Sequence, residues 1–393
     1  MNIKKLWIAI GILLLVLGVS SCHQSKDDVS INDSQTYPHT HTPSSGVTEN
    51  VAEPTCEKDG SYDEVVYCSE CGEEISRTKK NTTAVAHQYK NEKCVFCGIE
   101  KASDGLNFKS NGNGTCSVSG IGSCKDDDIV VPTVSPSGDR VTEIASSAFY
   151  NCVGLTSIRI PDTVTSIGND AFADCANLQS MIVSDNLNSL GAGAFSGCDR
   201  LQYNKANGLC HLGSDHNPYL ILIKPEDKTQ TLYETNQNTA FIDSYAFSSC
   251  ENATNIIVHD RVTSIGACAF QDCSNLISVT LPEGITYIAG CMFKNCDNLK
   301  NVTIPNSVTK IGEQAFENCK SLESIVIPAS VKTIEKNAFK NCSGLEGVRF
   351  EKTNGWHCFD LSEPVISDLD LTNEEKNALS LSFRYTDYTW KRA

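Results

Sequence analysis

One phrase recurs along this chain at a fixed spacing: a phenylalanine followed three residues later by a cysteine. The phrase returns every 23 residues in two uninterrupted series of three and five copies. A unit of this length is too short to bury its own apolar face, so such units must stack and share one continuous core. The spacing therefore predicts a solenoid. The eight copies of the phrase are Phe149/Cys152, Phe172/Cys175, Phe195/Cys198, Phe247/Cys250, Phe270/Cys273, Phe293/Cys296, Phe316/Cys319 and Phe339/Cys342.

The interval between the two series is longer than one repeat. From Cys198 to Phe247 it holds one additional repeat plus six residues. Within it, residues 219–225 (YLILIKP) stand where the strand phrase of the other copies should be. Residues 239–247 (TAFIDSYAF) stand where other copies lead into their phenylalanine. We therefore expect one degenerate coil in this interval.

Each repeat contains a short segment with the alternation of a strand. In residues 155–161 (LTSIRIP), Leu155, Ile158 and Ile160 are expected to face the core, whereas Ser157 and Arg159 face solvent. The proline ends the strand. The following residues 164–168 (VTSIG) form a second short apolar stretch on another side of the coil. Each coil is therefore expected to add one strand to a parallel sheet.

The full phrase, LxxIxIPxSVTxIGxxAFxxC, resembles the BspA-like leucine-rich repeats over roughly residues 105–393. The resemblance implies an α/β-type repeat solenoid: a right-handed leucine-rich repeat coil with a parallel strand ladder, over residues 105–350 and including an N-terminal hairpin. Two places depart from the pattern, because residues 203–206 lack the IxIP ending and Ala253 replaces leucine. Relatives by this repeat are regarded as cell-surface adhesins that engage host matrix or plasma proteins, or other bacteria.

Residues 1–22 are typical of a bacterial lipoprotein signal peptide. Lys4 and Lys5 precede an apolar run over residues 6–19, and small residues lead to Cys22. The run is shorter than the roughly 20 residues that span a bilayer. The match to a lipobox implies that Cys22 becomes the lipid-carrying first mature residue, which would anchor the chain to the cell surface, at the outer membrane if the cell has one. The alternative is an ordinary cleaved signal with an incidental cysteine.

Residues 23–50 are poor in large apolar side chains and are expected to form a flexible linker.

Residues 51–101 carry two C-x2-C-G turns, Cys68/Cys71 and Cys94/Cys97. Two such turns supply the four ligands of a structural zinc ion, and the segment resembles a small zinc-ribbon-like module. His87 and Cys56 are alternative ligands. Two disulfides are the competing interpretation, because an exported protein meets an oxidising environment.

The remaining cysteines do not form an obvious disulfide framework. One cysteine per repeat forms a column along the solenoid, which is typical of core packing because free cysteine is small and readily buried. Cys116 and Cys124 flank a Gly/Ser-rich hairpin, where a disulfide is plausible. Residues 351–393 leave the repeat pattern and are expected to cap the last coil. Within them, residues 372–375 (TNEE) match a capping box that opens a short helix.

Composition and motifs exclude several function classes. The formal net charge of −16 argues against nucleic acid as a partner and against membrane contact other than through the lipid anchor. We find no nucleophile motif with a base, no phosphate loop and no open metal site, so the chain is predicted not to be an enzyme. His357 and Cys358 are neighbours in the expected cap, where a structural role is favoured.

The outward side of the strand ladder is the surface most suited to binding. In its middle it carries uncharged β-branched, hydroxyl and amide side chains, which favour an extended protein ligand, although the same residues simply suit a strand. Adhesion is therefore the leading hypothesis. The alternatives are a structural or glycan-associated envelope protein and a non-catalytic accessory factor that presents a substrate. The outward residues are Ser157, Arg159, Ser180, Ile182, Asn255, Ile257, Ser278, Thr280, Asn301, Thr303, Ser324, Val326 and Arg349.

Overall fold

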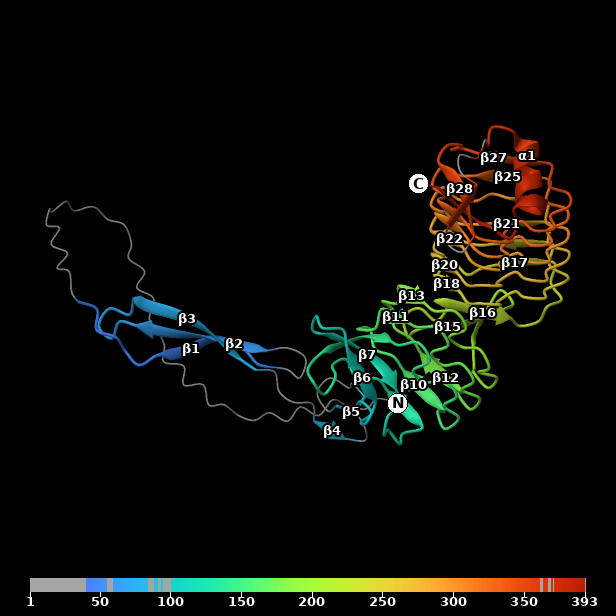
Figure 1. Cartoon of the computed structure of the whole chain (residues 1–393). Coiled ribbons are helices and arrows are strands. Elements are labelled where there is room, and N and C mark those ends of the chain that lie inside the picture. The colour runs from blue at the N-terminus through green and yellow to red at the C-terminus, as the bar shows by residue number, and fades with distance from the viewer. Residues whose placement is uncertain are drawn as a thin grey trace, which may run out of the picture. The chain divides into compact units, whose positions relative to one another are not determined.

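The computed structural model (Figure 1) describes residues 40–54, 59–83, 88–90, 93–94, 100–360, 363–366, 369 and 371–392. The predicted signal peptide, with Cys22, lies outside these ranges. The chain divides into two compact units, Met1–His87 and Gln88–Ala393, here called unit 1 and unit 2. Within the described ranges, no helix combines the length and the apolar character that crossing a bilayer requires.

Unit 1 is a three-stranded antiparallel sheet in the order β1-β2-β3, formed by β1 (Val47–Ala52), β2 (Gly60–Tyr67) and β3 (Glu74–Thr82). Strand β1 begins inside the range assigned to a flexible linker, because Val47 pairs with Val65 of β2. The boundary between the units lies inside the segment 51–101 that the sequence predicts as one module. Among the described apolar residues of unit 1, only Val65 and Cys68 are buried.

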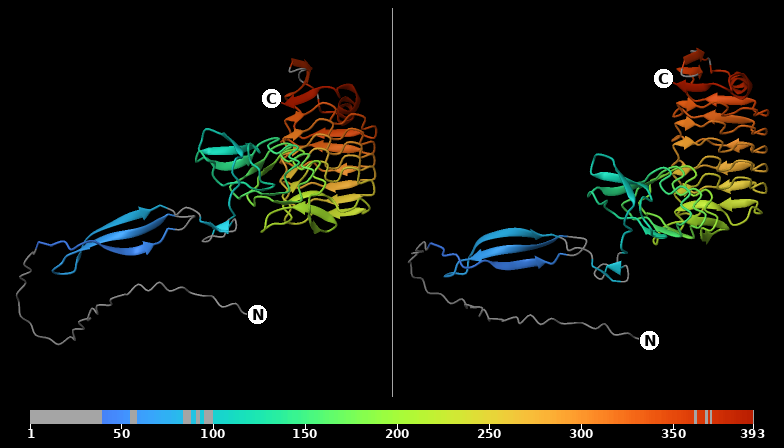
Figure 2. Two further views of the ribbon diagram at one scale, coloured as in Figure 1. Left: turned by 90° about the horizontal axis from the view of Figure 1, so that it is seen from below. Right: turned by 60° about the horizontal axis from the view of Figure 1, so that its bottom comes forward.

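Unit 2 is a solenoid whose coils contribute strands to two parallel ladders. Figure 2 shows the two columns of stacked strands in its C-terminal half. The first ladder uses the LxxIxIP phrase and comprises β8 (Asp128–Val130), β10 (Ser157–Arg159), β12 (Ser180–Ile182), β17 (Leu232–Glu234), β19 (Asn255–Ile257), β21 (Ser278–Thr280), β23 (Asn301–Val302), β25 (Ser324–Ile327) and β27 (Gly347–Phe350). The second ladder uses the VTxIG phrase and comprises β9 (Arg140–Ile144), β11 (Ser166–Ile167), β13 (Ser189–Leu190), β16 (Ile221–Pro225), β18 (Phe241–Ile242), β20 (Ser264–Ile265), β22 (Tyr287–Ile288), β24 (Lys310–Ile311) and β26 (Thr333–Ile334).

The ladders keep the register of the sequence repeat. Ser157 pairs with Ser180 and Ser278 pairs with Asn301, each a step of one repeat. The repeat phenylalanines stack inside the coils, with Phe149 on Phe172 at 5.3 Å between ring centroids and Phe316 on Phe339 at 5.0 Å. The prediction of a solenoid with a parallel strand ladder is therefore confirmed. Among the described residues, helices occur only near the C-terminus.

Close coil-to-coil contact also depends on backbone conformation. Asn151 and the residues at equivalent positions in later coils, such as Asn318 (φ 62°) and Asn341 (φ 60°), adopt left-handed backbone angles just before each cysteine. The glycine of the VTxIG phrase serves a different purpose. A Cβ on Gly168 would lie 2.4 Å from the backbone nitrogen of Ser146 in the preceding coil, so a larger residue at this position would require the two coils to move apart.

The irregular interval differs from its predicted arrangement. Residues 219–225 do not form the strand of the first ladder; β16 pairs in parallel with β18 and belongs to the second ladder. The first-ladder strand is β17, whose Leu232 pairs with Asn255 one repeat later. The apolar residues of β16 resemble those of a first-ladder strand, but β16 is buried on both faces and lacks the alternation of such a strand. Before β16, the strands β14 (Asn204–Ala206) and β15 (Leu209–Leu212) form an antiparallel pair, and β15 also pairs antiparallel with β16.

Both ends of the solenoid are covered. The hairpin β6 (Asn107–Ser110) and β7 (Thr115–Gly120) pairs with β9 at the first coil. A further short pair, β4 (Tyr89–Lys90) and β5 (Lys93–Cys94), precedes it. At the last coil, β30 (Thr389–Arg392) pairs with both β26 and β28 (Trp356–Asp360), and β28 pairs with β29 (Glu363–Ile366). Trp356 and Trp390 are fully buried there.

The C-terminal helix starts one residue later than the capping-box motif suggests. Helix α1 (Glu374–Leu379) is capped by Asn373, whose side chain accepts a hydrogen bond from the backbone N–H of Lys376 at 2.8 Å. Thr372 therefore precedes the cap instead of forming it. A π-helical turn, η1 (Ser380–Arg384), continues from α1, and Asn377 of α1 donates hydrogen bonds to the backbone oxygens of Val348 and Leu371.

The first prediction concerns the phenylalanine column. Phe293 is fully buried between Phe270 and Phe316. We expect Phe293→Ala to lower the free energy of unfolding by about 3–5 kcal/mol, because it leaves a cavity inside a stack that cannot collapse. Urea denaturation measures the change. Thr303→Ala, on the outer face of the same part of the ladder, is expected to change it by less than about 0.5 kcal/mol. Equal effects of the two substitutions would contradict the column.

A second prediction concerns Asp243, the residue after β18. It is 6% exposed and lines two cavities of about 260 and 200 Å³. Burial raises the pKa of its carboxyl group from 3.8 to about 7, although a hydrogen bond from the backbone N–H of Ser244 lowers it. The folded chain therefore holds a proton that the unfolded chain has lost above about pH 4. This contribution to stability is full below that pH and disappears as the pH rises through about 7.

We expect Asp243→Asn to remove this pH dependence, because the amide cannot ionise. The free energy of unfolding of the variant, relative to that of the original chain, should rise by at most about 4 kcal/mol between pH 4 and pH 7. Above pH 7 the difference should stay constant. Urea denaturation at several pH values measures this difference. Asp260→Asn, at an exposed position, controls for the loss of one negative charge. If the difference in stability between the variant and the original chain does not change between pH 4 and pH 7, the carboxyl group of Asp243 is already ionised in the folded chain over this range.

Candidate binding face of the repeat ladder

The outward side of the first ladder is the candidate site. None of the outward residues predicted from the sequence is buried, and each occupies the predicted side of its strand or directly follows it. The apolar members are the most telling, because Ile257 is 38% exposed and Val326 is 36% exposed. The alternation in the repeat phrase therefore identified which side chains of each strand face outward.

The face is divided into two parts by the irregular interval. Strands β8, β10 and β12 form one sheet, whereas β17, β19, β21 and β23 form another, followed by the pair β25 and β27. After β12, the backbone N–H of Val183 bonds to the carbonyl of Gly213 and not to a first-ladder strand. Ser157, Arg159, Ser180 and Ile182 therefore lie on a different sheet from the other predicted residues. The sequence predicts a single strip, but the structure has two separate faces.

The N-terminal face is a hollow of about 1090 Å³. Its lining includes the outward residues Ser157, Arg159, Ser180 and Ile182, together with residues 100–105 and 125–130. Arg159 forms ion pairs with Glu100 and Asp215, each at 3.0 Å. The positive charge of this predicted outward residue is therefore balanced by two carboxylates.

Ser157 is also engaged within the protein. Its hydroxyl donates to Asp128 Oδ1 at 2.8 Å, and Thr156 donates to the same oxygen at 2.7 Å. The bonds from Thr156 and Ser157 lower the pKa of Asp128. The hollow mixes several acidic with several basic side chains, so it offers no field of one sign to a charged ligand.

The C-terminal face has a simpler chemistry. From Asn255 to Val326 its outward side chains are uncharged, and Asn255 donates to the Ser278 hydroxyl across neighbouring coils at 2.8 Å. Charge occurs only at the two ends. At one end, Glu234 Oε1 lies 3.1 Å from His259 Nε2. Near the other end, Arg349 pairs in register with Val326.

Two residues of this face were missed by the sequence analysis. Leu232, 52% exposed, and Glu234 are the outward residues of β17. They were missed because the strand of this coil was assigned to residues 219–225. The 23-residue offset from Asn255 and Ile257 would have located them, since the register is kept even where the phrase is not.

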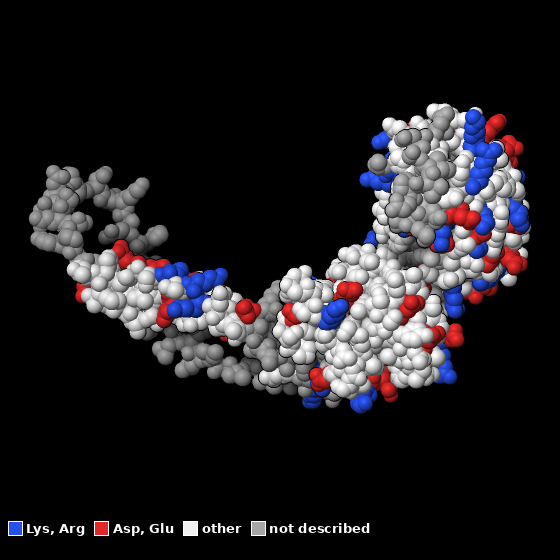
Figure 3. Space-filling view, viewed as in Figure 1, with Lys and Arg blue, Asp and Glu red and all other residues white. Residues whose placement is uncertain are grey.

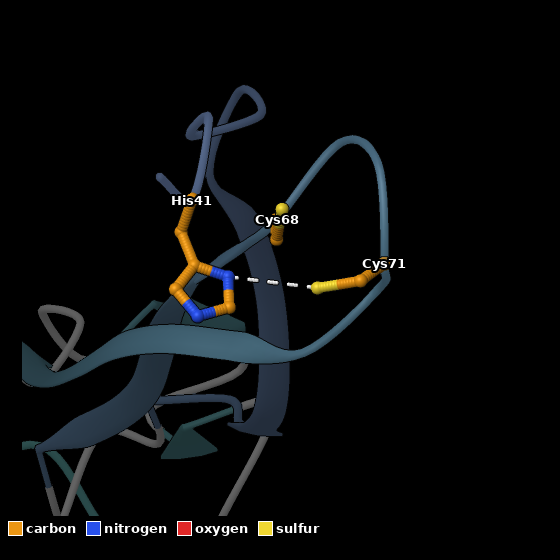
Figure 4. A group of neighbouring side chains, drawn as sticks. All are labelled: His41, Cys68 and Cys71. Carbon is orange, nitrogen blue, oxygen red and sulfur yellow. Dashed lines mark hydrogen bonds between the residues drawn. The ribbon is translucent and has the colours of Figure 1, made fainter. Parts of the chain in front are cut away.

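The predicted zinc ligands fall in different parts of the chain. Cys68 follows β2 and Cys71 lies in the next turn, both in unit 1, whereas Cys94 ends β5 in unit 2. Cys97, His87 and Cys56 lie outside the described residues. The structure instead brings His41 to Cys68 and Cys71 (Figure 4). His41 belongs to the range 23–50 that the sequence predicts as a flexible linker, and it precedes Cys68 by 27 residues.

The thiols of the repeat cysteines form hydrogen bonds between neighbouring coils. From the second coil of each series, the cysteine Sγ donates to the carbonyl of the phenylalanine in the preceding coil, as from Cys175 to Phe149 at 3.0 Å and from Cys319 to Phe293 at 3.2 Å. Burial raises the pKa of Cys342 to about 12. The interpretation of this column as core packing agrees with these contacts.

Two further expectations about cysteines can be compared with the structure. Cys116 and Cys124 are both buried free thiols, so the disulfide considered for this hairpin is not formed. Cys116 instead directs its thiol at the carbonyl of Asp139. In the C-terminal cap, burial raises the pKa of Cys358 to about 12, which is the opposite of what a nucleophilic cysteine needs.

The comparisons with known proteins identify the repeat. The family model described as "BspA type Leucine rich repeat region" matches six copies over residues 136–213 and 235–362. This is more than half of the chain, and the chain therefore belongs to the BspA-type leucine-rich repeat family. The search of curated proteins found no match.

Several solved structures are similar to the chain. A leucine-rich cell surface protein from Faecalibacterium prausnitzii is 22% identical, with 64% of this chain and 94% of that chain covered and a TM-score of 0.38. The leucine-rich repeat protein TpLRR of T. pallidum is 23% identical, with coverages of 63% and 91% and a TM-score of 0.32. The pneumococcal vaccine antigen PcpA is 16% identical, with coverages of 64% and 87% and a TM-score of 0.33.

The third prediction concerns thiol reactivity. We expect Cys296, Cys319 and Cys342 to react with iodoacetamide only after unfolding, because the thiolate is the reactive form and burial raises the pKa of each of these thiols. Cys152 is only partly buried and should react earlier, which provides the internal control. Peptide mass spectrometry after timed labelling measures the order. Rapid labelling of Cys319 in the native chain, or disulfides between neighbouring coils, would contradict it.

Proposed function

We propose that this chain is a lipid-anchored cell-surface protein whose C-terminal ladder face binds an extended protein partner. The C-terminal ladder face is defined as the outward residues of β17, β19, β21, β23, β25 and β27, with Thr303. Partners of this kind include host matrix or plasma proteins and surface proteins of other cells. The proposal concerns binding and assigns no catalytic step to the chain.

The observation that carries the proposal is the uncharged strip between Glu234 and Arg349. Six strands at the usual spacing of about 4.8 Å give it a length of about 24 Å. Leu232, Ile257 and Val326 expose apolar surface along it. A long and narrow face of this kind suits an extended polypeptide segment better than a small molecule, which needs an enclosing pocket.

The charge distribution supports a protein partner over nucleic acid. The chain has a net charge of −16. Figure 3 shows Lys and Arg interspersed with Asp and Glu on the visible face of unit 2, without one continuous basic surface. A phosphate backbone requires such a surface, because its binding depends on many Lys and Arg contacts.

A glycan-associated envelope protein is the principal alternative. Sugar rings are commonly held by stacking on exposed aromatic side chains. The outward positions of the described first-ladder strands, from β8 to β27, carry no aromatic residue. This composition favours protein over glycan. Two further alternatives are a structural role in the envelope and a non-catalytic role in presenting a substrate to a partner enzyme.

The membrane anchor is proposed from the sequence alone. Cys22 follows an apolar run and small residues, the arrangement that precedes lipid attachment. The same signal places the mature chain outside the cytoplasm. A protein held there by lipid would present its ladder face to partners outside the cell.

The fourth prediction tests the ladder face. We expect the chain to bind one or more proteins in a screen that includes matrix proteins, plasma proteins and polysaccharides. Changing Thr280 and Thr303 together to arginine should weaken that binding at least about tenfold, because two bulky charges would sit in the middle of an uncharged strip. Surface plasmon resonance measures the loss.

Thr286→Arg with Thr309→Arg is the matched control. These threonines are exposed beside the second ladder, one repeat apart, and add the same charge elsewhere. Binding that survives the ladder pair as well as the control pair would remove this face from the proposal. Binding to polysaccharides alone would support the glycan-associated alternative.

A further inference from the structure

We propose that unit 1 holds a zinc ion between His41, Cys68 and Cys71. Their ligand atoms all lie within 4.8 Å of one another, and Cys71 Sγ is 3.5 Å from His41 Nδ1. Figure 4 shows the imidazole facing Cys71 beside Cys68, at the turn that follows β2. The site needs no residue of unit 2.

Backbone hydrogen bonds bring the histidine to the cysteines. The segment before β1 runs along the end of β2, where Ser44 N–H donates to the Tyr67 carbonyl and Ser69 N–H donates to the Thr42 carbonyl, both at 2.8 Å. An isolated antiparallel bridge joins Pro43 to Cys68 between them. His41, one residue before Thr42, is therefore held beside the turn by the main chain.

The turn itself fixes the two cysteines. Gly72 N–H donates to the Cys68 carbonyl at 2.9 Å, and Cys68 N–H donates to the Glu73 carbonyl at 2.8 Å. Gly72 has a φ of 75°, a left-handed conformation that favours glycine. This closes a tight C-x2-C-G turn, so both sulfurs are presented from one short loop.

The spacing fits a tetrahedral zinc ion. With Zn–S of about 2.3 Å and Zn–N of about 2.0 Å, a sulfur and a nitrogen on the same ion lie about 3.5 Å apart and two sulfurs about 3.8 Å apart. The observed Sγ–Nδ1 distance of 3.5 Å matches the first value. Two thiolates and one imidazole are also a donor set that zinc prefers over magnesium or calcium.

A carboxylate lies behind the histidine. Glu73 Oε2 is 3.6 Å from His41 Nε2, the ring nitrogen that does not face Cys71. Histidine ligands usually direct their second nitrogen at a carboxylate or carbonyl, which fixes the tautomer and the ring orientation. Glu73 comes from the same turn as Cys71, so the arrangement is completed locally.

The described residues of unit 1 form only a small apolar core. Its described part buries only two apolar residues, and all residues of β3 except Thr82 are exposed. Its ion pairs centred on Arg77 are at the surface, where solvent screens them and each contributes little to stability. Small folds without a core commonly depend on a metal or on disulfides. A zinc ion here would join the segment before β1 to the β2–β3 turn.

The test uses the whole chain purified under reducing conditions. We expect its zinc content, measured by elemental mass spectrometry, to fall by one equivalent in each of His41→Ala, Cys68→Ser and Cys71→Ser. Cobalt(II) added to the metal-free chain should give the absorption of tetrahedral thiolate coordination. Glu73→Gln should keep the site but weaken metal affinity about 10–100-fold. His216→Ala, which changes an exposed histidine of unit 2, is the matched control and should change nothing.

Three results would overturn the proposal. One is metal content that does not depend on His41. Another is a loss of metal in Cys94→Ser equal to that in Cys71→Ser, which would restore the four-cysteine site predicted from the sequence. The third is the absence of cobalt absorption in a chain whose Cys68 and Cys71 are joined by a disulfide. Because cobalt binding is measured on the unaltered chain, a variant that fails to fold does not leave the question open.

Discussion

The in-register stacking of 23-residue coils is the constraint on which unit 2 depends. Each coil supplies the partner for the next: a backbone ladder on two sides, a phenylalanine ring at 5.0–6.0 Å, and a carbonyl that accepts the following cysteine thiol. None of these interactions exists in a single coil. Both ends therefore need covering, and the β6–β7 hairpin and the two buried tryptophans of the C-terminal segment serve that purpose.

The irregular interval shows what happens where stacking is interrupted. Between Phe195 and Phe247 the buried residues separate into two core clusters, with Tyr233 packing on Phe247 in place of a repeat phenylalanine. The same interruption leaves the carboxyl group of Asp243 buried beside small cavities and splits the outward face in two. A local departure from the repeat thus determines which residues can form one binding surface.

The two units solve the problem of stability in different ways. Unit 2 buries a column of cysteines as small apolar residues whose thiols bond to carbonyls, and these residues need no disulfide or metal. The described part of unit 1 has almost no apolar core, so Cys68 and Cys71 are residues available to stabilise it. One residue type therefore has two physical roles in this chain, and burial decides between them.

The sequence by itself determined the repeat length, the stacking of the phenylalanines and the outward side of each regular strand, because these depend on periodicity alone. It also indicated the chemistry of the C-terminal face, from Asn255 to Val326. Only the tertiary structure showed that Arg159 is paired with Glu100 and Asp215, that residues 221–225 join the second ladder, and that His41 lies beside Cys68 and Cys71. The reason is physical: periodicity fixes contacts between equivalent positions, whereas contacts between unrelated segments depend on how the whole chain folds back on itself.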